Sequence, residues 1–340
     1  MPNKPNTYHL LESHWQKPIW WLTLVLYPLS RLFELMVGIR RFMYSKSWLK
    51  SHTLSVPVVI IGNIHVGGSG KTPITAAIVN KLTQCNIKVG IISRGYGRQD
   101  KTTRIVNPND DASINGDEPL LLSHKTGVPI AVGKSRISAG ELLLQHFPQT
   151  QLIIADDGLQ HYSMQRDIEI IVFPADSCQS HLDVLPNGPL RENINRISEA
   201  DILIISNAAE NTTIPAVLPK NGKIFNSTLN YKQFYALNNQ DKKVDAQFFH
   251  QCKTMALAGI GKPQNFFTAL EKMGINLIEK RILPDHANID IQSLPENVKI
   301  IITEKDAVKL NKYQLPNVWV LPIEATLPES LYKEIKCLLK

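Results

Sequence analysis

The chain has 340 residues, which predicts two domains, and 43% hydrophobic against 20% charged residues, which is typical of a globular protein with substantial cores. The net charge of +7 predicts an anionic partner, but the basic residues form no run and no nucleic-acid motif is visible, so no nucleic-acid partner is expected. Four widely spaced cysteines without a C-x-x-C pair argue against a zinc cluster or disulfide framework and favour a reducing compartment.

Residues 1–50 are predicted to form an amphipathic helix or pair of helices. Residues 19–29 are apolar or nearly so, but a spanning helix needs about 20 such residues, and Pro28 interrupts the run. A longer span would bury Arg31 and Glu34 in lipid, which is costly. Tryptophans and arginines suit the headgroup boundary, so we expect this segment to lie on a membrane surface. A soluble packing helix and a transmembrane span remain as alternatives.

A phosphate loop is predicted at residues 62–73, which read GNIHVGGSGKTP. An apolar, β-branched run (56–62) predicts a buried strand before it, and residues 72–84 have helical spacing after it. The glycines let backbone N–H groups approach phosphate oxygens, and the helix N-terminus adds positive charge. Lys71 is expected to reach the β- and γ-phosphates and Thr72 to bind Mg²⁺. The predicted nucleotide-binding residues are His65, Val66, Gly67, Gly68, Ser69, Gly70, Lys71 and Thr72, with His65 where the usual motif has glycine.

Further buried strands are predicted within residues 88–98, where the strand ends in a glycine-rich turn, within 151–161, and at 168–173 and 200–206. Together they indicate a doubly wound, mostly parallel sheet. In 151–161 the apolar residues of the strand lead into Asp156 and Asp157, where a sheet beside a phosphate loop presents metal-supporting carboxylates. Asp117, which precedes Glu118 and Pro119, has the pattern of a helix N-cap, and the residues themselves leave cap and functional site both open.

A second, smaller α/β domain is predicted after an extended ribbon. Residues 223–237 alternate between apolar and polar, as a connecting ribbon does, and residues 254–274 restart the pattern of strand, glycine turn and helix. The glycine turn in 254–274 is too weak a signal for a second nucleotide site. Residues 299–310 predict strand, turn and helix, where Glu304, Lys305 and Asp306 either cap the helix, which we favour, or face the nucleotide.

Eight short motifs in register resemble the tetraacyldisaccharide 4'-kinase family, the lipid A 4'-kinases of Gram-negative bacteria. They are GNIHVGGSGKTP (62–73), SRGYGR (93–98), GDEP (116–119), DDGLQH (156–161), NGPLRE (187–192), AGIGKPQNFF (258–267), PDH (284–286) and TEKDAVK (303–309). The family's own loop also lacks the first glycine. The resemblance implies ATP- and Mg²⁺-dependent phosphorylation of the 4'-hydroxyl of a tetraacylated glucosamine disaccharide 1-phosphate, the lipid A precursor. It also implies two α/β/α domains joined by a β-ribbon, docked by the N-terminal helix on the cytoplasmic face of the inner membrane.

The same resemblance assigns roles to particular residues. It makes Asp117 the base near the sugar hydroxyl, paired with His286. Lys71 of the phosphate loop is the third residue expected to be catalytic. A base helps because an alcohol is a poor nucleophile until its proton is removed. Glu118, Asp156 and Asp157 are candidates for Mg²⁺ or its waters. Arg191 is either an anion clamp for substrate, because guanidinium matches phosphate bidentately, or part of a surface salt bridge.

The fold class expected is therefore α/β: a P-loop NTPase-like, mostly parallel sheet domain, a smaller α/β domain and an N-terminal membrane-surface helix. The expected limits are 1–50 for the helical segment, 51–222 for the kinase domain, 223–237 for the ribbon and 238–340 for the C-terminal domain. One rival is a deviant phosphate-loop switch ATPase, although Val66 stands where those loops carry a signature lysine. A non-enzymatic membrane-docked module is a second rival. No oligomeric state is predicted.

Overall fold

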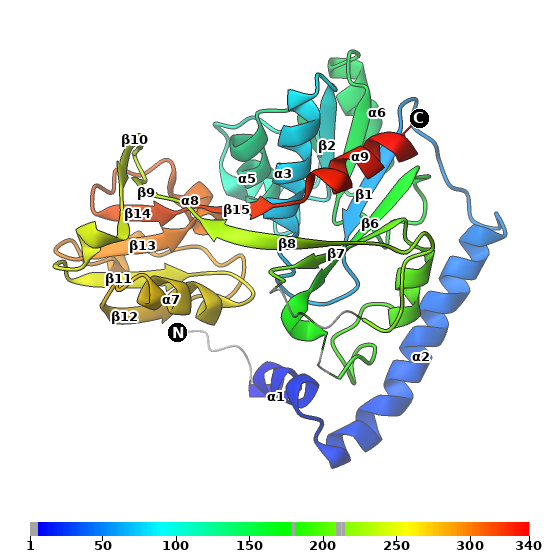
Figure 1. The fold of residues 1–340 in the computed structure, drawn as a ribbon, viewed down its shortest axis with the longest axis horizontal. Coiled ribbons are helices and arrows are strands. Elements are labelled where there is room, and N and C mark those ends of the chain that lie inside the picture. The colour runs from blue at the N-terminus through cyan, green and yellow to red at the C-terminus, as the bar shows by residue number, and fades with distance from the viewer. Residues whose placement is uncertain (1–5, 179–180, 209–211, 213–214, 340) are drawn as a thin grey trace.

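The computed structural model describes residues 6–178, 181–208, 212 and 215–339. This part of the chain contains one sheet of nine strands and one of six, with two N-terminal helices beside the larger sheet (Figure 1). The first five residues of the predicted N-terminal segment lie outside the described residues.

The larger sheet confirms the predicted mostly parallel architecture. Its strands are β1 (Val58–Gly62), β2 (Val89–Ser93), β3 (Arg104–Ile105), β4 (Ile130–Val132), β5 (Leu152–Asp156), β6 (Ile168–Pro174), β7 (Ile202–Ser206), β8 (Lys223–Tyr231) and β15 (Ile323–Thr326). They lie in the order β15-β8-β7-β6-β1-β5-β2-β4-β3, and the neighbours from β8 to β4 pair in parallel. The edge strands β15 and β3 pair antiparallel. The central strands are buried along their length because helices cover both faces, which explains their continuous apolar sequences.

Two hydrophobic cores cover the two faces of this sheet. The first core includes Ile78 of α3 (Lys71–Gln84), Leu120 of α5 (Asp117–Thr126) and Ile335 of α9 (Glu329–Leu338). The second includes Leu143 of α6 (Arg136–His146) and Ile197 of the short 3₁₀ helix η2 (Ile194–Glu199). Smaller helical turns are α4 (Ala112–Asn115) and η1 (Ala175–Ser177). The phosphate loop therefore lies between β1, at the centre of the sheet, and α3 on one face.

The smaller sheet has its own cores on both faces. Its strands are β9 (Phe234–Ala236), β10 (Asn239–Val244), β11 (Thr254–Ala258), β12 (Leu277–Ile282), β13 (Lys299–Thr303) and β14 (Val318–Leu321), in the order β10-β9-β14-β13-β11-β12. Phe267 of α7 (Pro263–Lys272) packs on one face, and Leu310 of α8 (Glu304–Leu310) packs on the other. Two 3₁₀ turns, η3 (Ala246–Phe249) and η4 (Ile291–Ser293), complete this part.

An antiparallel ribbon of β8 and β15 joins the two sheets, with pairs from Tyr231↔Ile323 to Thr228↔Thr326. The chain leaves the larger sheet along β8 and returns along β15, after which α9 packs on the same core as α3 (Figure 1). Residues 323–338 thus lie with the larger sheet, whereas the sequence limits placed all of 238–340 in the second domain. The apolar stripe of α9 could serve either sheet, so its sequence does not identify the partner.

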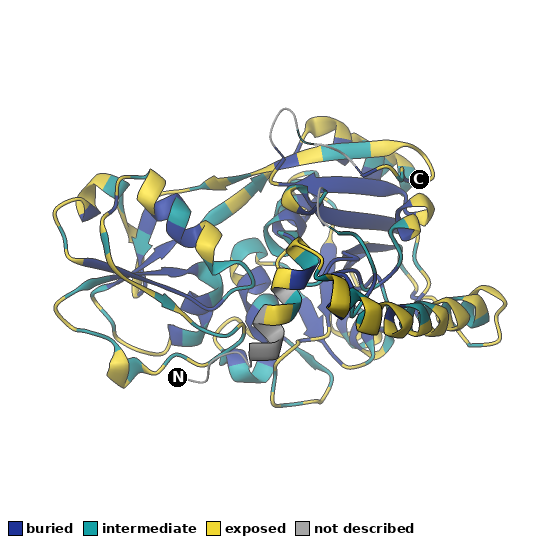
Figure 2. Ribbon diagram, turned by 90° about the horizontal axis from the view of Figure 1, so that it is seen from below, coloured by how far each residue is buried: buried dark blue, intermediate teal, exposed yellow. Residues whose placement is uncertain are grey.

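Two helices begin the described chain, α1 (Asn6–Gln16) and α2 (Trp20–Ser45). Helix α2 is continuous through Pro28, which interrupts the apolar run of the sequence but not the helix. A proline inside a helix costs about 3 kcal/mol, a cost that 26 residues of helix can outweigh. By length and composition alone, α2 could cross a membrane. Its large apolar residues are mostly exposed, such as Trp20 at 79% and Leu24 at 73% (Figure 2).

Candidate active site

The phosphate loop connects β1 to α3 and is shaped by glycines in the left-handed region. Gly67 has φ +98° and Gly70 has φ +75°, values that side chains with a Cβ rarely adopt. A Cβ placed at Gly67 or Gly68 would meet nothing within 4 Å, so the space above the loop is open. The hydroxyl of Ser69 is buried and has no hydrogen-bond partner among the described residues. An open, glycine-lined turn with an unpaired buried hydroxyl fits a phosphate group.

Residues 187–192 hold the other side of this loop. The Val66 N–H donates to the Pro189 carbonyl at 2.9 Å, and the Arg191 N–H donates to the Ile64 carbonyl at 2.6 Å. The His65 ring is buried edge-on to Phe173, and burial lowers its pKa to about 4. The ring therefore packs into the protein, and nucleotide binding by His65 and Val66 stays a prediction.

Asp157 forms ion pairs with two basic side chains beside the phosphate loop. Its carboxylate lies 3.3 Å from Lys71 Nζ and 3.3 Å from an Arg191 nitrogen. Burial by itself raises the pKa of Asp157, but Lys71, Arg191 and Arg136 outweigh it and hold that pKa at about 2. The residue also has φ +47°, an uncommon conformation that recurs at functional sites. The structure thus brings Lys71, Asp157 and Arg191 together at the mouth of the phosphate loop.

Asp156, the last residue of β5, differs from its neighbour Asp157. It is fully buried, accepts a hydrogen bond from the Thr75 hydroxyl at 3.3 Å, and has its pKa raised to about 7 by burial and by the nearby charges of Glu118 and Asp157. Adjacent acids with pKa values pushed apart are a common property of functional sites.

The same residues bear on where Mg²⁺ could bind. Among the described residues there is no group of three or more His, Cys, Asp or Glu side chains that could hold a metal ion. Mg²⁺ usually takes one or two carboxylates and completes its shell with substrate phosphates and water. The donors present, a hydroxyl at Thr72 and carboxylates at Asp156, Asp157 and Glu118, therefore suit an ion shared with a nucleotide rather than a cage made by protein.

Asp117 and His286 are in contact although they belong to the parts of the chain around different sheets. Asp117 is the first residue of α5, and His286 lies in the loop after β12, yet Asp117 Oδ2 lies 3.1 Å from His286 Nδ1. His286 has φ +63°, and its ring centroid lies 5.1 Å from that of Tyr96. Burial raises the pKa of Asp117, but the hydrogen bond to His286 and the charge of Lys309 outweigh it, so the pKa is lowered overall. Asp117 is thus held as a carboxylate.

Three basic residues in this site were not among the predicted site residues, although for Lys305 a position facing the nucleotide was an alternative to the favoured helix cap. Lys305 Nζ lies 3.1 Å from Glu118, 2.9 Å from Asp285 and 3.4 Å from His286 Nε2. Lys309 lies 3.5 Å from Asp117. Their spacing of four residues puts both on one face of α8, a signal that the sequence contained. The cap of α8 is made by Thr303, whose hydroxyl accepts the Asp306 N–H, and not by Lys305.

The third unpredicted residue is Arg136, at the start of α6. Its guanidinium is buried and donates to the backbone carbonyls of Asp156 and Asp157, the latter at 2.5 Å. It therefore fixes the turn that carries both acids.

The smaller sheet also reaches the phosphate loop. A Cβ on Gly261, in the turn between β11 and α7, would lie 2.8 Å from the Gly68 nitrogen, so this turn requires glycine. The next residue, Lys262, pairs with Asp176 of the larger sheet at 2.6 Å. The glycine turn of 254–274, which was not predicted to be a second nucleotide site, thus contacts the phosphate loop.

A phosphate loop between a central parallel strand and a helix, facing acidic side chains at the neighbouring strand end, defines a nucleotide-binding protein of the P-loop class. The family model for tetraacyldisaccharide-1-P 4'-kinase matches residues 22–340. The chain belongs to this family, which confirms the resemblance and the kinase function, and the switch-ATPase alternative is not favoured.

Relatives with this description cover nearly the whole chain. The tetraacyldisaccharide 4'-kinase of Neisseria gonorrhoeae is 45% identical over 333 residues, which are 97% of this chain and 96% of the relative. That of Chromobacterium violaceum is 41% identical over 97% of this chain and 98% of the relative. The crystal structure of LpxK from Aquifex aeolicus in complex with ATP is similar, with a TM-score of 0.80 and 28% identity, and covers 94% of this chain and 100% of that one.

Proposed function

We propose that the chain transfers the γ-phosphoryl group of ATP to the 4'-hydroxyl of a tetraacyl disaccharide 1-phosphate at a membrane surface. The observation that carries this proposal is the 3.1 Å contact of Asp117 with His286 beside the phosphate loop. An alcohol acceptor needs a proton acceptor, and the Asp117 carboxylate held by His286 supplies one.

The phosphate loop and its neighbours bind the donor. Backbone N–H groups at the glycines and the Ser69 hydroxyl contact phosphate oxygens, and the Lys71 ammonium neutralises their charge. Arg191 turns from Asp157 to the transferring group, because its guanidinium matches phosphate geometry. Thr72 and the carboxylates of Asp156, Asp157 and Glu118 would hold Mg²⁺, which when bound neutralises charge on the phosphates.

Asp117 and His286 serve the acceptor. The Asp117 carboxylate takes the proton of the attacking hydroxyl while the new O–P bond forms and the bond from the γ-phosphorus to ADP breaks. His286 holds that carboxylate in position through its Nδ1. Because the two residues come from different sheets, the acceptor must lie where the sheets face each other.

Helix α2 places this site at the lipid surface. Its exposed apolar residues give a face that suits the interface between headgroups and acyl chains, where a tetraacylated substrate resides. The active site then works on the cytoplasmic side, where ATP is available.

The domain limits follow the sheets. Residues 51–222 with α9 form the kinase domain, and β9 to β14 with α7 and α8 form the second domain. The ribbon between them is β8 with β15, which also forms the edge of the larger sheet.

The test is an assay of purified protein with [γ-³²P]ATP, Mg²⁺ and the disaccharide 1-phosphate lipid in mixed micelles. Label should appear on the lipid, and digestion should place it on the 4' oxygen. ATP hydrolysis that rises with self-association, without label on lipid, would support the switch-ATPase reading instead.

A further inference from the structure

The N-terminal helices form hydrogen bonds and ion pairs with residues 183–199, which we call the bridge segment. Helix α2 also contacts the ring of Tyr162 through Tyr44, Arg40 and Arg41. The Trp15 indole donates to the Pro186 carbonyl at 3.0 Å, and the Ser30 hydroxyl donates to the Val184 carbonyl at 3.0 Å. Further polar contacts of the helices with this segment are His14 with Asn187, Arg31 with Asp183, Glu34 with Asn193, and Arg41 with Glu192 and Glu199. The N-terminal helices, which are proposed to lie on the membrane, thus contact the bridge segment directly.

The bridge segment contacts the phosphate loop on its other side. The backbones of Pro189 and Arg191 pair with those of Val66 and Ile64, and the Arg191 side chain reaches Asp157. The segment therefore lies between the membrane helix and the nucleotide site, in contact with both.

Glu192 is the residue where these contacts converge. Its side chain is 1% exposed. It accepts a hydrogen bond from Gln160 Nε2 at 2.8 Å and another from the Tyr162 hydroxyl. Gln160 Nε2 also donates to the Asn63 carbonyl at 3.2 Å, at the start of the phosphate loop. Glu192 thus supports the loop through Gln160 and adjoins Arg191 in the chain.

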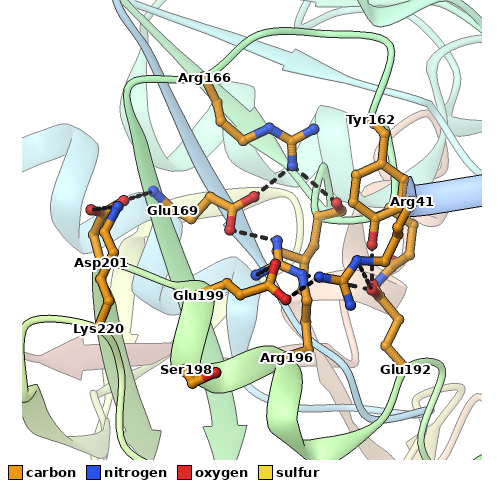
Figure 3. A network of polar contacts seen from close by, with 12 residues as sticks. Arg41, Tyr162, Arg166, Glu169, Glu192, Arg196, Ser198, Glu199, Asp201 and Lys220 are labelled. Atoms are coloured by element: carbon orange, nitrogen blue, oxygen red, sulfur yellow. Dashed lines mark hydrogen bonds and ion pairs between the residues drawn. The ribbon is translucent and has the colours of Figure 1, made fainter. Parts of the chain in front are cut away.

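Two arginines neutralise this buried carboxylate (Figure 3). Arg196 Nε lies 3.7 Å from Glu192 Oε2 and is shared with Glu169, whereas Arg41 Nε lies 3.8 Å from the same oxygen and comes from α2. A buried carboxylate is strongly destabilised when it loses a cationic partner. The position of Glu192 therefore depends on where α2 holds Arg41.

We propose that Glu192 is a positioning residue that couples the seating of α2 to the geometry of the phosphate loop and Arg191. With α2 seated, Arg41 holds Glu192, and Gln160 and Arg191 are in place for the nucleotide. With α2 displaced, Glu192 loses one cation and this arrangement relaxes. The proposal rests on the kinase activity and the membrane role proposed above, and it adds that membrane engagement favours turnover.

The chain offers a matched pair of variants for the test. Arg41→Ala removes the contact with Glu192, whereas Lys46→Ala removes the same charge from an exposed position at the end of α2, where the side chain lies over the Phe42 ring. Full-length proteins are assayed with the lipid substrate in anionic vesicles, with kcat, KM for ATP and vesicle binding measured separately. We expect Arg41→Ala to lower kcat by about 10- to 100-fold, the size of effect that small misplacement produces. Lys46→Ala should keep kcat, and both should bind vesicles equally.

Two more variants separate positioning from folding. Arg41→Lys should recover part of the lost kcat because it restores the cation. Glu192→Gln should lower kcat, and adding Arg41→Ala to it should change little further, since both act on one contact. If Glu192→Gln fails to fold, the two variants at the partly buried Arg41 still decide the question.

Wild-type kcat in Arg41→Ala, or an equal loss in Lys46→Ala, would overturn the coupling. An inactive wild-type enzyme would instead overturn the proposed function, so the two failures are distinguishable.

Discussion

Asp117 and His286 are 169 positions apart in the chain, yet a 3.1 Å hydrogen bond joins them. Asp117 begins helix α5, which packs on the larger sheet, and His286 lies in the loop after β12 of the smaller sheet. Neither sheet contains the pair without the other. The ribbon of β8 and β15 is what connects the two sheets along the chain, so the geometry of this contact depends on how the sheets face each other.

The first prediction concerns each partner separately. Asp117→Ala and His286→Ala should each lower kcat by about 10²- to 10⁴-fold, the usual range for loss of a general base. ATP affinity, measured by calorimetry, should stay near that of wild type because neither residue belongs to the phosphate loop. A His286→Ala enzyme with normal kcat and a raised KM for lipid would limit this residue to substrate binding.

The second prediction concerns the nucleotide. Lys71→Ala and Thr72→Ala should each lower turnover by about a hundredfold or more, because they remove a phosphate cation and a Mg²⁺ ligand. Lys81→Ala is the control, since this lysine lies on the same helix and pairs with Glu329 on the surface. Full turnover by Lys71→Ala would contradict the phosphate-loop assignment.

The third prediction concerns α2 and the membrane. Trp20→Glu combined with Leu24→Glu should move the protein from the pellet to the supernatant in sedimentation with anionic liposomes, because charges are costly below the headgroups. Both side chains are more than 70% exposed, so folding should be unaffected. Leu218→Glu, at another exposed apolar position, is the control. Unchanged sedimentation of the double variant would show that α2 does not dock there.

The fourth prediction concerns stability against pH. Burial lowers the pKa of His65 from 6.5 to about 4, so between these values the unfolded chain binds a proton that the folded chain does not. The free energy of unfolding should therefore fall as pH decreases from 6.5 towards 4. Above pH 6.5 this group should cost the protein no stability. From pH 7.5 to pH 5 the loss due to this group is about 2 kcal/mol. Urea unfolding should show a smaller loss in His65→Gln, and equal losses would mean that His65 charges freely in the folded state.

Much of the fold and the nucleotide site could be predicted because their signals are local. The strand before the phosphate loop, its glycines, Lys71 and the helix after it are consecutive, so their spacing alone determines how they fold. The position of Asp156 and Asp157 at the end of β5 could also be predicted, because parallel strands present their carboxyl ends at one edge of the sheet.

Other features depend on tertiary packing that spacing does not reveal. The contact between Asp117 and His286 was expected from the family resemblance, not from the residues themselves. Lys305 was read as part of a helix cap, because its partners Glu118 and Asp285 are distant in the chain or lie in a different loop. The return of α9 to the larger sheet was missed for the same reason.

The measurement that tests the central claim most directly is a double-mutant cycle on kcat with Asp117→Ala, His286→Ala and the combined variant. If the two residues act as one unit across the two sheets, the combined variant should be little slower than the slower single variant. Penalties that multiply would contradict this account and mean that the two residues act separately.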